Sequence, residues 1–146
     1  MLRSMTIAVT LVVTSCMAAE AASDEYKEVA DAAYCAGVIQ RSIEITKRLP
    51  ALTDPIVYRA NEQLLARLVG LVQGALRQKH IAPRTVNRLT ANGQSDEQLC
   101  DDVTWKCWTE ALDRDAQNMD AGANERMQEN CMRPAETVCR RVEACF

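Results

Sequence analysis

The sequence predicts an all-α protein of four to five helices, in which disulfide bonds staple a C-terminal antiparallel hairpin. Its 146 residues include only six aromatic residues, five glycines and four prolines, whereas 48% are hydrophobic and 25% charged. Alanine, leucine, glutamine, glutamate and arginine are abundant, and these residues favour helices over strands. No segment alternates apolar and polar residues as a half-buried strand does. The apolar content excludes a wholly disordered chain.

The N-terminus has the pattern of a secretory signal peptide. Arg3 provides a basic start, residues 5–13 form an apolar run, and mainly small residues continue to Ala22. The apolar run is too short to cross a bilayer as a helix, which takes about 20 apolar residues. We therefore predict a removable leader over residues 1–21 and a single helical, disulfide-bonded domain over residues 22–146.

A leader of this kind predicts a periplasmic or secreted protein. Within that prediction there is an alternative, because Val13-Thr14-Ser15-Cys16 resembles a bacterial lipoprotein box. In that case Cys16 would carry a lipid anchor and hold the protein at a membrane surface.

The first helix of the domain is expected to start at Ser23, which would cap it, and to end at Arg48, because Leu49-Pro50 cannot continue it. Thr53 or Asp54 would cap the second helix, which has a proline at its first position. Apolar residues at helical spacing predict the buried stripe of this second helix. They are Val57, Leu64, Leu68, Leu71, Val72 and Ala75.

Glycines on the second helix suggest how it packs. Gly70 and Gly74 lie four residues apart, so they share one face of the helix. The first helix carries several alanines at the same spacing, and we expect the two small-residue faces to pack together.

Two further helices are predicted before the C-terminal segment. A short one covers residues 83–89 and is closed by Asn92-Gly93, a typical helix end. The next begins with a capping box formed by Ser95 and Gln98 and continues to about Met119.

The last predicted helix covers residues 124–144, after a turn over residues 120–122. Pro134 lies inside this range, and a proline interrupts or kinks a helix because it lacks an N–H donor. The C-terminal part of the chain should therefore be an antiparallel hairpin with a kinked second arm.

Six cysteines follow the predicted leader, and an even number in an exported chain predicts three disulfide bonds. Cys100 and Cys107 are seven residues apart, which is about 10.5 Å along a helix. A disulfide needs Cα atoms about 4.4–6.8 Å apart, so these two cannot bond within one helix. Cys139 and Cys145 are excluded by the same argument.

The cysteine spacings instead fit bonds across a hairpin that turns near residue 119. Residues level with each other across such a hairpin have a constant sum of residue numbers, and two pairs of cysteines meet this condition. Elimination leaves a third pair, which would tie the C-terminus to the first helix. The predicted bonds are Cys107–Cys131, Cys100–Cys139 and Cys35–Cys145. The chain has no Cys-x-x-Cys pair, so we predict no metal site and no cofactor.

Trp105 and Trp108 are the candidate binding residues with the largest side chains. They are three residues apart and therefore adjacent on one helical face, on either side of Cys107. One interpretation is that they cover the disulfide and the core. The other is that they anchor a partner, because tryptophan is enriched among the residues that dominate binding energy.

Charge is unevenly distributed along the predicted domain. Residues 23–95 carry a net charge of +3, whereas residues 96–146 carry −6. The basic residues near the 80s turn could oppose the acidic half internally, or contact lipid head groups or an acidic partner. They are Arg77, Lys79, Arg84 and Arg88, next to His80. The acidic pairs Asp101-Asp102 and Asp113/Asp115 are expected to form a solvated face.

No arrangement typical of catalysis is present. His80, the single histidine, has no nucleophile or orienting partner nearby in sequence, and no Gly-x-Ser-x-Gly elbow occurs. The leading hypothesis is a small exported interaction module, not an enzyme, whose partner is another periplasmic or envelope protein rather than nucleic acid. One alternative is a carrier that holds a small apolar ligand between the first, second and fourth helices. An enzyme of unknown type is a further, weaker alternative.

Overall fold

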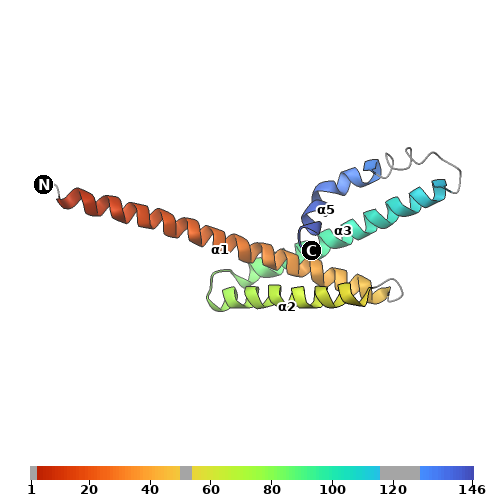
Figure 1. The fold of residues 1–146 in the computed structure, drawn as a ribbon, viewed down its shortest axis with the longest axis horizontal. Helices are drawn as coiled ribbons and strands as arrows, with labels where there is room; N and C mark the ends of the chain where they lie inside the picture. The colour runs from red at the N-terminus through yellow and green to blue at the C-terminus, as the bar shows by residue number, and fades with distance from the viewer. Residues whose placement is uncertain (1–2, 50–53, 116–128) are drawn as a thin grey trace.

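The computed structural model describes residues 3–49, 54–115 and 129–146. They form helices α1 (Arg3–Arg48), α2 (Pro55–Arg77) and α3 (Pro83–Asp115), the 3₁₀ turn η2 (Arg133–Ala135) and helix α5 (Glu136–Glu143) (Figure 1). No strand occurs among these residues, which confirms the all-α prediction. None of their helices combines the length and the apolar character needed to cross a membrane.

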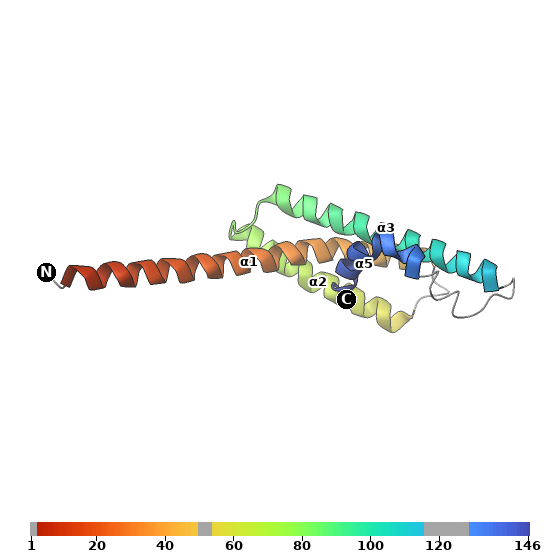
Figure 2. The same ribbon diagram turned by 90° about the horizontal axis from the view of Figure 1, so that it is seen from above.

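Helix α1 is the central element of the fold. Helix α2 returns along the C-terminal half of α1, and α3 crosses α1 on another side. The N-terminal end of α1 projects away from the other helices in both views (Figures 1 and 2). The predicted leader lies in this projecting part. Whether it is removed stays a prediction.

The predicted cap of the second helix is present, whereas the predicted cap of the first helix is not. Helix α1 begins at Arg3, so the prediction that Ser23 caps it is wrong for the full chain. The reason is that residues 3–22 contain no proline or glycine that would stop the helix from extending backwards. The cap of α2 is confirmed, because Oδ1 of Asp54 accepts a hydrogen bond of 2.8 Å from the N–H of Ile56.

Helix α3 is continuous, whereas the sequence predicted two helices separated at Asn92-Gly93. Gly93 is buried inside α3, where a Cβ atom would lie 2.1 Å from the carbonyl oxygen of Tyr34 in α1. A Cβ at Gly37 of α1 would lie 2.0 Å from the carbonyl oxygen of Thr90. The two glycines therefore allow the backbones of α1 and α3 to touch where they cross. The predicted capping box of Ser95 is likewise wrong, because Ser95 lies within the helix.

The predicted packing of Gly70 and Gly74 against α1 is also wrong. A Cβ at either position would meet nothing within 4 Å. Val72 of α2 packs on Ala32 and Ala33 of α1. The partly buried side chains of Leu68 and Leu76 pack against the same cluster. Elsewhere on the predicted stripe, Val57 and Leu71 are exposed. Aliphatic side chains of α2 make this contact with α1, and neither glycine is needed for a close approach.

All three predicted disulfides are confirmed. The Cα–Cα distances are 5.2 Å for Cys35–Cys145, 5.4 Å for Cys100–Cys139 and 5.8 Å for Cys107–Cys131. Two of these bonds join α3 to the C-terminal segment as nested rungs, and the third joins that segment to α1. The Cys35–Cys145 and Cys100–Cys139 bonds and the side chains around Val38 form one continuous core cluster.

The kink predicted at Pro134 is confirmed. Residues 129–132 are helical, the proline lies in the 3₁₀ turn η2, and α5 follows directly. The predicted turn over residues 120–122 and the start of the last helix lie outside the described residues.

Candidate interaction surface

The tryptophan pair lies on α3 beyond the point where this helix crosses α1. The ring centroids of Trp105 and Trp108 are 5.2 Å apart, and the ring planes are tilted by 38°. The two residues are 58% and 46% exposed, whereas Cys107 between them is 2% exposed. The disulfide therefore faces the C-terminal segment, and the indole rings face solvent. They do not belong to the buried core.

A leucine extends the same apolar strip by one turn. Leu112 follows Trp108 by four residues and Trp105 by seven, so the three side chains lie along one face of α3. It is 45% exposed. We call Trp105, Trp108 and Leu112 the tryptophan face.

This face continues the line of residues through which α3 packs on α1. Thr90 donates a hydrogen bond of 3.1 Å to the carbonyl oxygen of Ala33, and Gly93 touches the backbone at Tyr34. Steps of three and four residues then lead through Glu97 and Asp101 to Trp105. Figure 1 shows that α3 and α1 diverge over this stretch. The tryptophan face is thus a helix-packing face beyond the reach of α1.

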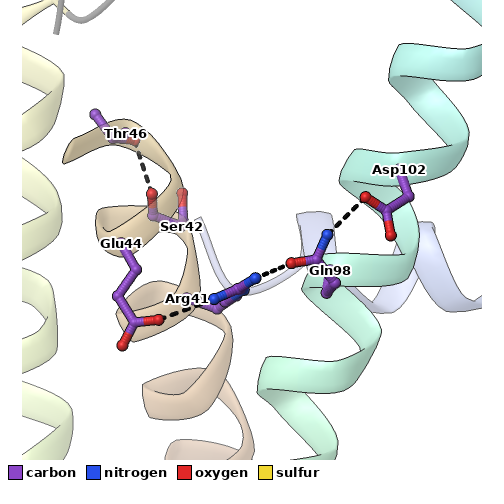
Figure 3. A network of polar contacts seen from close by, with 6 residues as sticks. All are labelled: Arg41, Ser42, Glu44, Thr46, Gln98 and Asp102. Atoms are coloured by element: carbon purple, nitrogen blue, oxygen red, sulfur yellow. Dashed lines mark hydrogen bonds and ion pairs between the residues drawn. The ribbon is translucent and has the colours of Figure 1, made fainter. Parts of the chain in front are cut away.

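A polar network at the divergence helps to set the direction in which α3 leaves α1 (Figure 3). The guanidinium group of Arg41 contacts the carboxylate of Glu44 at 3.0 Å and donates a hydrogen bond to the side-chain oxygen of Gln98. The amide nitrogen of Gln98 donates a hydrogen bond of 2.6 Å to Asp102, one turn further along α3. Gln98 thus links the two helices, instead of completing the predicted capping box.

Exposed acidic side chains lie at both ends of the tryptophan face. Asp101 and Asp102 precede Trp105 by four and three residues, and Asp113 follows Leu112 at the other end. Lys106 lies further round the helix, and its Nζ is 3.9 Å from Oε1 of Glu110. The predicted solvated acidic face agrees with the exposure of Asp101, Asp102 and Asp113, and the side chain of Asp115 lies outside the described part of the chain. The sequence did not indicate that exposed indole rings lie between these acidic side chains.

Burial and charge repulsion act together on Glu97, beside this region. Desolvation raises the pKa of its carboxyl group above the ordinary value, and the nearby Asp101 raises it further. A hydrogen bond with Ser42 and the charge of Arg41 oppose this rise in pKa without cancelling it. The ionised form of Glu97 is therefore less favourable in the folded protein than in the unfolded chain.

Replacing Glu97 by glutamine should stabilise the protein at neutral pH. A carboxyl group with a raised folded pKa favours folding below its unfolded pKa, and that contribution is lost as pH rises through the folded pKa. The gain in melting temperature of Glu97→Gln over the unchanged protein should thus be present at about pH 7 and shrink at about pH 3, where the carboxyl is neutral in both states. A gain that is equal at both pH values would contradict this assignment.

A second polar site joins three distant segments of the chain. The hydroxyl of Tyr34 donates a hydrogen bond of 2.9 Å to Asp96, and Arg141 also contacts Asp96. The guanidinium carbon of Arg141 lies 4.6 Å from the centre of the Tyr34 ring, a cation–π geometry. Burial is the main cause that raises the pKa of Tyr34. The hydroxyl therefore stays protonated and keeps its role as a donor.

A cavity of about 410 Å³ lies beside this site, within the usual size range of ligand pockets. Its walls come from α1, α3 and the C-terminal segment, and α2 contributes none of them. The lining includes Ala30, Tyr34, Leu89, Ala144 and the Cys35–Cys145 disulfide. The sequence-based alternative placed an apolar ligand between the first, second and fourth predicted helices. The cavity is mainly apolar, as that alternative requires, but the second helix does not line it.

The predicted basic residues lie at the other end of α3 from the tryptophan face. Arg77, Lys79, Arg84 and Arg88 are exposed around the turn between α2 and α3. None of the ion pairs found among the described residues includes any of these four basic side chains. The prediction that these residues oppose the acidic half internally thus finds no support in direct contacts. The structure does not bring them together with Trp105 and Trp108.

The turn that presents these basic residues is ordered by the end of α2. Lys79 has a φ of 61°, in the left-handed region where glycine is usual. The N–H groups of Lys79 and His80 donate to the carbonyl oxygens of Leu76 and Ala75, at 3.1 and 2.9 Å. His80 also places Nδ1 2.7 Å from Oε1 of Glu25 on α1. Its contact is thus with a surface carboxylate.

Comparison with known proteins yields no match to a protein-family model, to a characterised protein or to a solved structure. Among the described residues, no group of three or more histidine, cysteine, aspartate or glutamate side chains is placed to hold a metal ion.

Proposed function

We propose that this protein is an exported, non-catalytic interaction module that binds another periplasmic or envelope protein through its tryptophan face. The observation that carries the proposal is the exposure of two adjacent indole rings on a hairpin cross-linked by disulfides. Exposing large apolar side chains side by side is costly in water, and such patches mark interaction sites. Tryptophan is also among the residues that most often dominate binding energy.

The disulfides support a rigid presentation of this face. Trp105 lies between the α3 ends of the Cys100–Cys139 and Cys107–Cys131 bonds, and Trp108 directly follows Cys107. A preorganised surface loses less conformational entropy on binding, which favours affinity. The same bonds support export, because disulfides form and persist in oxidising compartments.

Replacing Trp105 and Trp108 together by alanine should abolish capture of the partner. Removing a hot-spot side chain costs about 2 kcal/mol or more in binding free energy, so the loss in affinity should exceed tenfold. The measurement is quantitative pull-down from periplasmic extract with the disulfide-bonded protein as bait, and circular dichroism verifies the fold of each variant.

The matched control is the double variant Ile56→Ala/Val57→Ala on α2, since both of these apolar residues are also exposed. It should retain the partner. Capture that survives loss of the tryptophans, or that disappears equally in the control, would refute the tryptophan face as the binding site.

A second candidate function is favoured by the cavity between α1, α3 and the C-terminal segment. We propose as this alternative that the protein carries a small apolar ligand there. Native mass spectrometry of freshly purified protein should then show a retained mass. Ala30→Phe fills the cavity and should remove that mass, whereas Ala60→Phe on the exposed side of α2 should not. Repeated spectra of ligand-free protein would exclude the carrier function.

A further inference from the structure

The charges around the tryptophan face indicate which kind of partner fits it. The apolar strip of Trp105, Trp108 and Leu112 is flanked by three exposed carboxylates, those of Asp101, Asp102 and Asp113. Two basic residues close to this surface, Lys106 on α3 and Arg41 on α1, each contact another side chain. Lys106 faces Glu110, and Arg41 contacts Glu44 and Gln98. The face thus combines an apolar centre with a negatively charged rim.

Two kinds of interaction then favour the same partner. Carboxylates at the rim of an interface attract lysine and arginine and repel acidic side chains, which sets specificity and association rate. The faces of indole rings attract ammonium and guanidinium groups as well, through cation–π interactions. A surface of anionic lipids would meet the same carboxylates and be repelled.

The position of the face suggests the shape of the partner. It continues the line of α3 residues that packs against α1, and α1 diverges from it (Figure 1). A helix lying along α3 in place of α1 would cover the indole rings and Leu112 with its apolar side, and its flanking residues would reach the carboxylates.

We propose that the tryptophan face binds a basic amphipathic helix of another protein, with apolar residues over the indole rings and lysine or arginine beside the three aspartates. This inference rests on the proposed interaction function and adds to it the chemistry of the partner.

Tryptophan fluorescence tests the proposal directly, because the chain contains only these two tryptophans. The disulfide-bonded protein is titrated with three designed peptides that share one leucine stripe and carry lysine, glutamine or glutamate at the flanking positions. We expect the lysine peptide to shift the emission to shorter wavelength and to bind at least tenfold more tightly than the glutamate peptide. Its affinity should fall as salt screens the charges.

A charge-neutralised variant tests the rim. Asp101→Asn/Asp102→Asn/Asp113→Asn should reduce the preference for lysine over glutamate about tenfold, a change that corresponds to about 1.4 kcal/mol. The control changes three exposed acids elsewhere, as Glu28→Gln/Glu62→Gln/Glu143→Gln. It alters the net charge equally and should keep the preference.

Several outcomes would overturn the inference. One is equal binding of the lysine, glutamine and glutamate peptides; another is an absence of any emission shift with the lysine peptide up to about 1 mM. A shift produced by anionic vesicles as strongly as by the peptide would assign the face to a membrane instead. If the glutamine peptide binds as well as the lysine peptide while Trp105→Ala/Trp108→Ala still loses the captured partner, the interaction function stands and the charge inference fails.

Discussion

Replacing Gly93 by alanine should lower the free energy of unfolding by about 2–3 kcal/mol, although alanine is the better helix former. The added Cβ would lie 2.1 Å from the carbonyl oxygen of Tyr34, which belongs to the backbone of α1 and cannot rotate away. The two helices must therefore separate where they cross. Separation would also loosen the packing around Val38 and Tyr34, which share a core cluster with the Cys35–Cys145 and Cys100–Cys139 disulfides.

Gly70→Ala is the matched control, because it makes the same change in the middle of a helix. Nothing lies within 4 Å of a Cβ at Gly70, so only the helix propensity changes, and alanine should stabilise the protein by about 0.8–1 kcal/mol. Urea unfolding of both variants measures the two effects. Changes of the same sign at both glycines would show that α1 and α3 are not in backbone contact.

Removing the Cys35–Cys145 disulfide should cost more stability than removing either of the others. It closes a loop of 110 residues, compared with 39 for Cys100–Cys139 and 24 for Cys107–Cys131. On the chain-entropy account, the restriction of the unfolded chain is worth about 4–5 kcal/mol for the longest loop and about 3–3.5 kcal/mol for the shortest. The Cys35–Cys145 bond also holds the C-terminal segment against α1, beside the Tyr34–Arg141 contact.

The double variants Cys35→Ala/Cys145→Ala and Cys107→Ala/Cys131→Ala provide the comparison, since replacing both cysteines leaves no free thiol. Thermal unfolding should give the lower melting temperature for the first. If the second variant were the less stable, the local strain or packing of the hairpin, and not the length of the closed loop, would determine the contribution of each bond.

The two hairpin disulfides could be predicted because their pairing depends on residue numbers and helix geometry, and elimination then left Cys35–Cys145. Once two helices run antiparallel, cysteines at matching distances from the turn must lie level, wherever the rest of the chain goes. The break at Pro134 is equally local, since the missing N–H acts within its own helix. The cap of α2 follows from Asp54 and the proline behind it in the same way.

The roles of the glycines could not be predicted from local pattern. Asn92-Gly93 resembles a helix end, but in the structure the missing Cβ serves contact with another helix. Conversely, Gly70 and Gly74 have the spacing of a helix-packing face, but a Cβ atom at either position would meet nothing within 4 Å. Which glycine lies at a helix crossing depends on a contact between residues about 60 positions apart, and spacing within one helix does not contain that information.

Only part of the candidate site could be predicted from the sequence. Helical periodicity makes Trp105 and Trp108 neighbours and allows Leu112 to be added by counting four residues further. Their exposure depends on α1 diverging from α3 before the tryptophans are reached. The contact of Tyr34 with Asp96 and Arg141 is of the same kind, because three separate segments must fold before its members meet.

The helical class, the two disulfides of the hairpin and the adjacency of the indole rings could be read from the chain alone, because each follows from backbone periodicity. The third cysteine pair then followed by elimination. The packing of the helices was needed to establish that α3 runs unbroken, that Gly37 and Gly93 form the crossing, and that the tryptophans are exposed between acidic side chains. Those features arise from where one helix stops covering another, and that position is set by the packing of the whole chain.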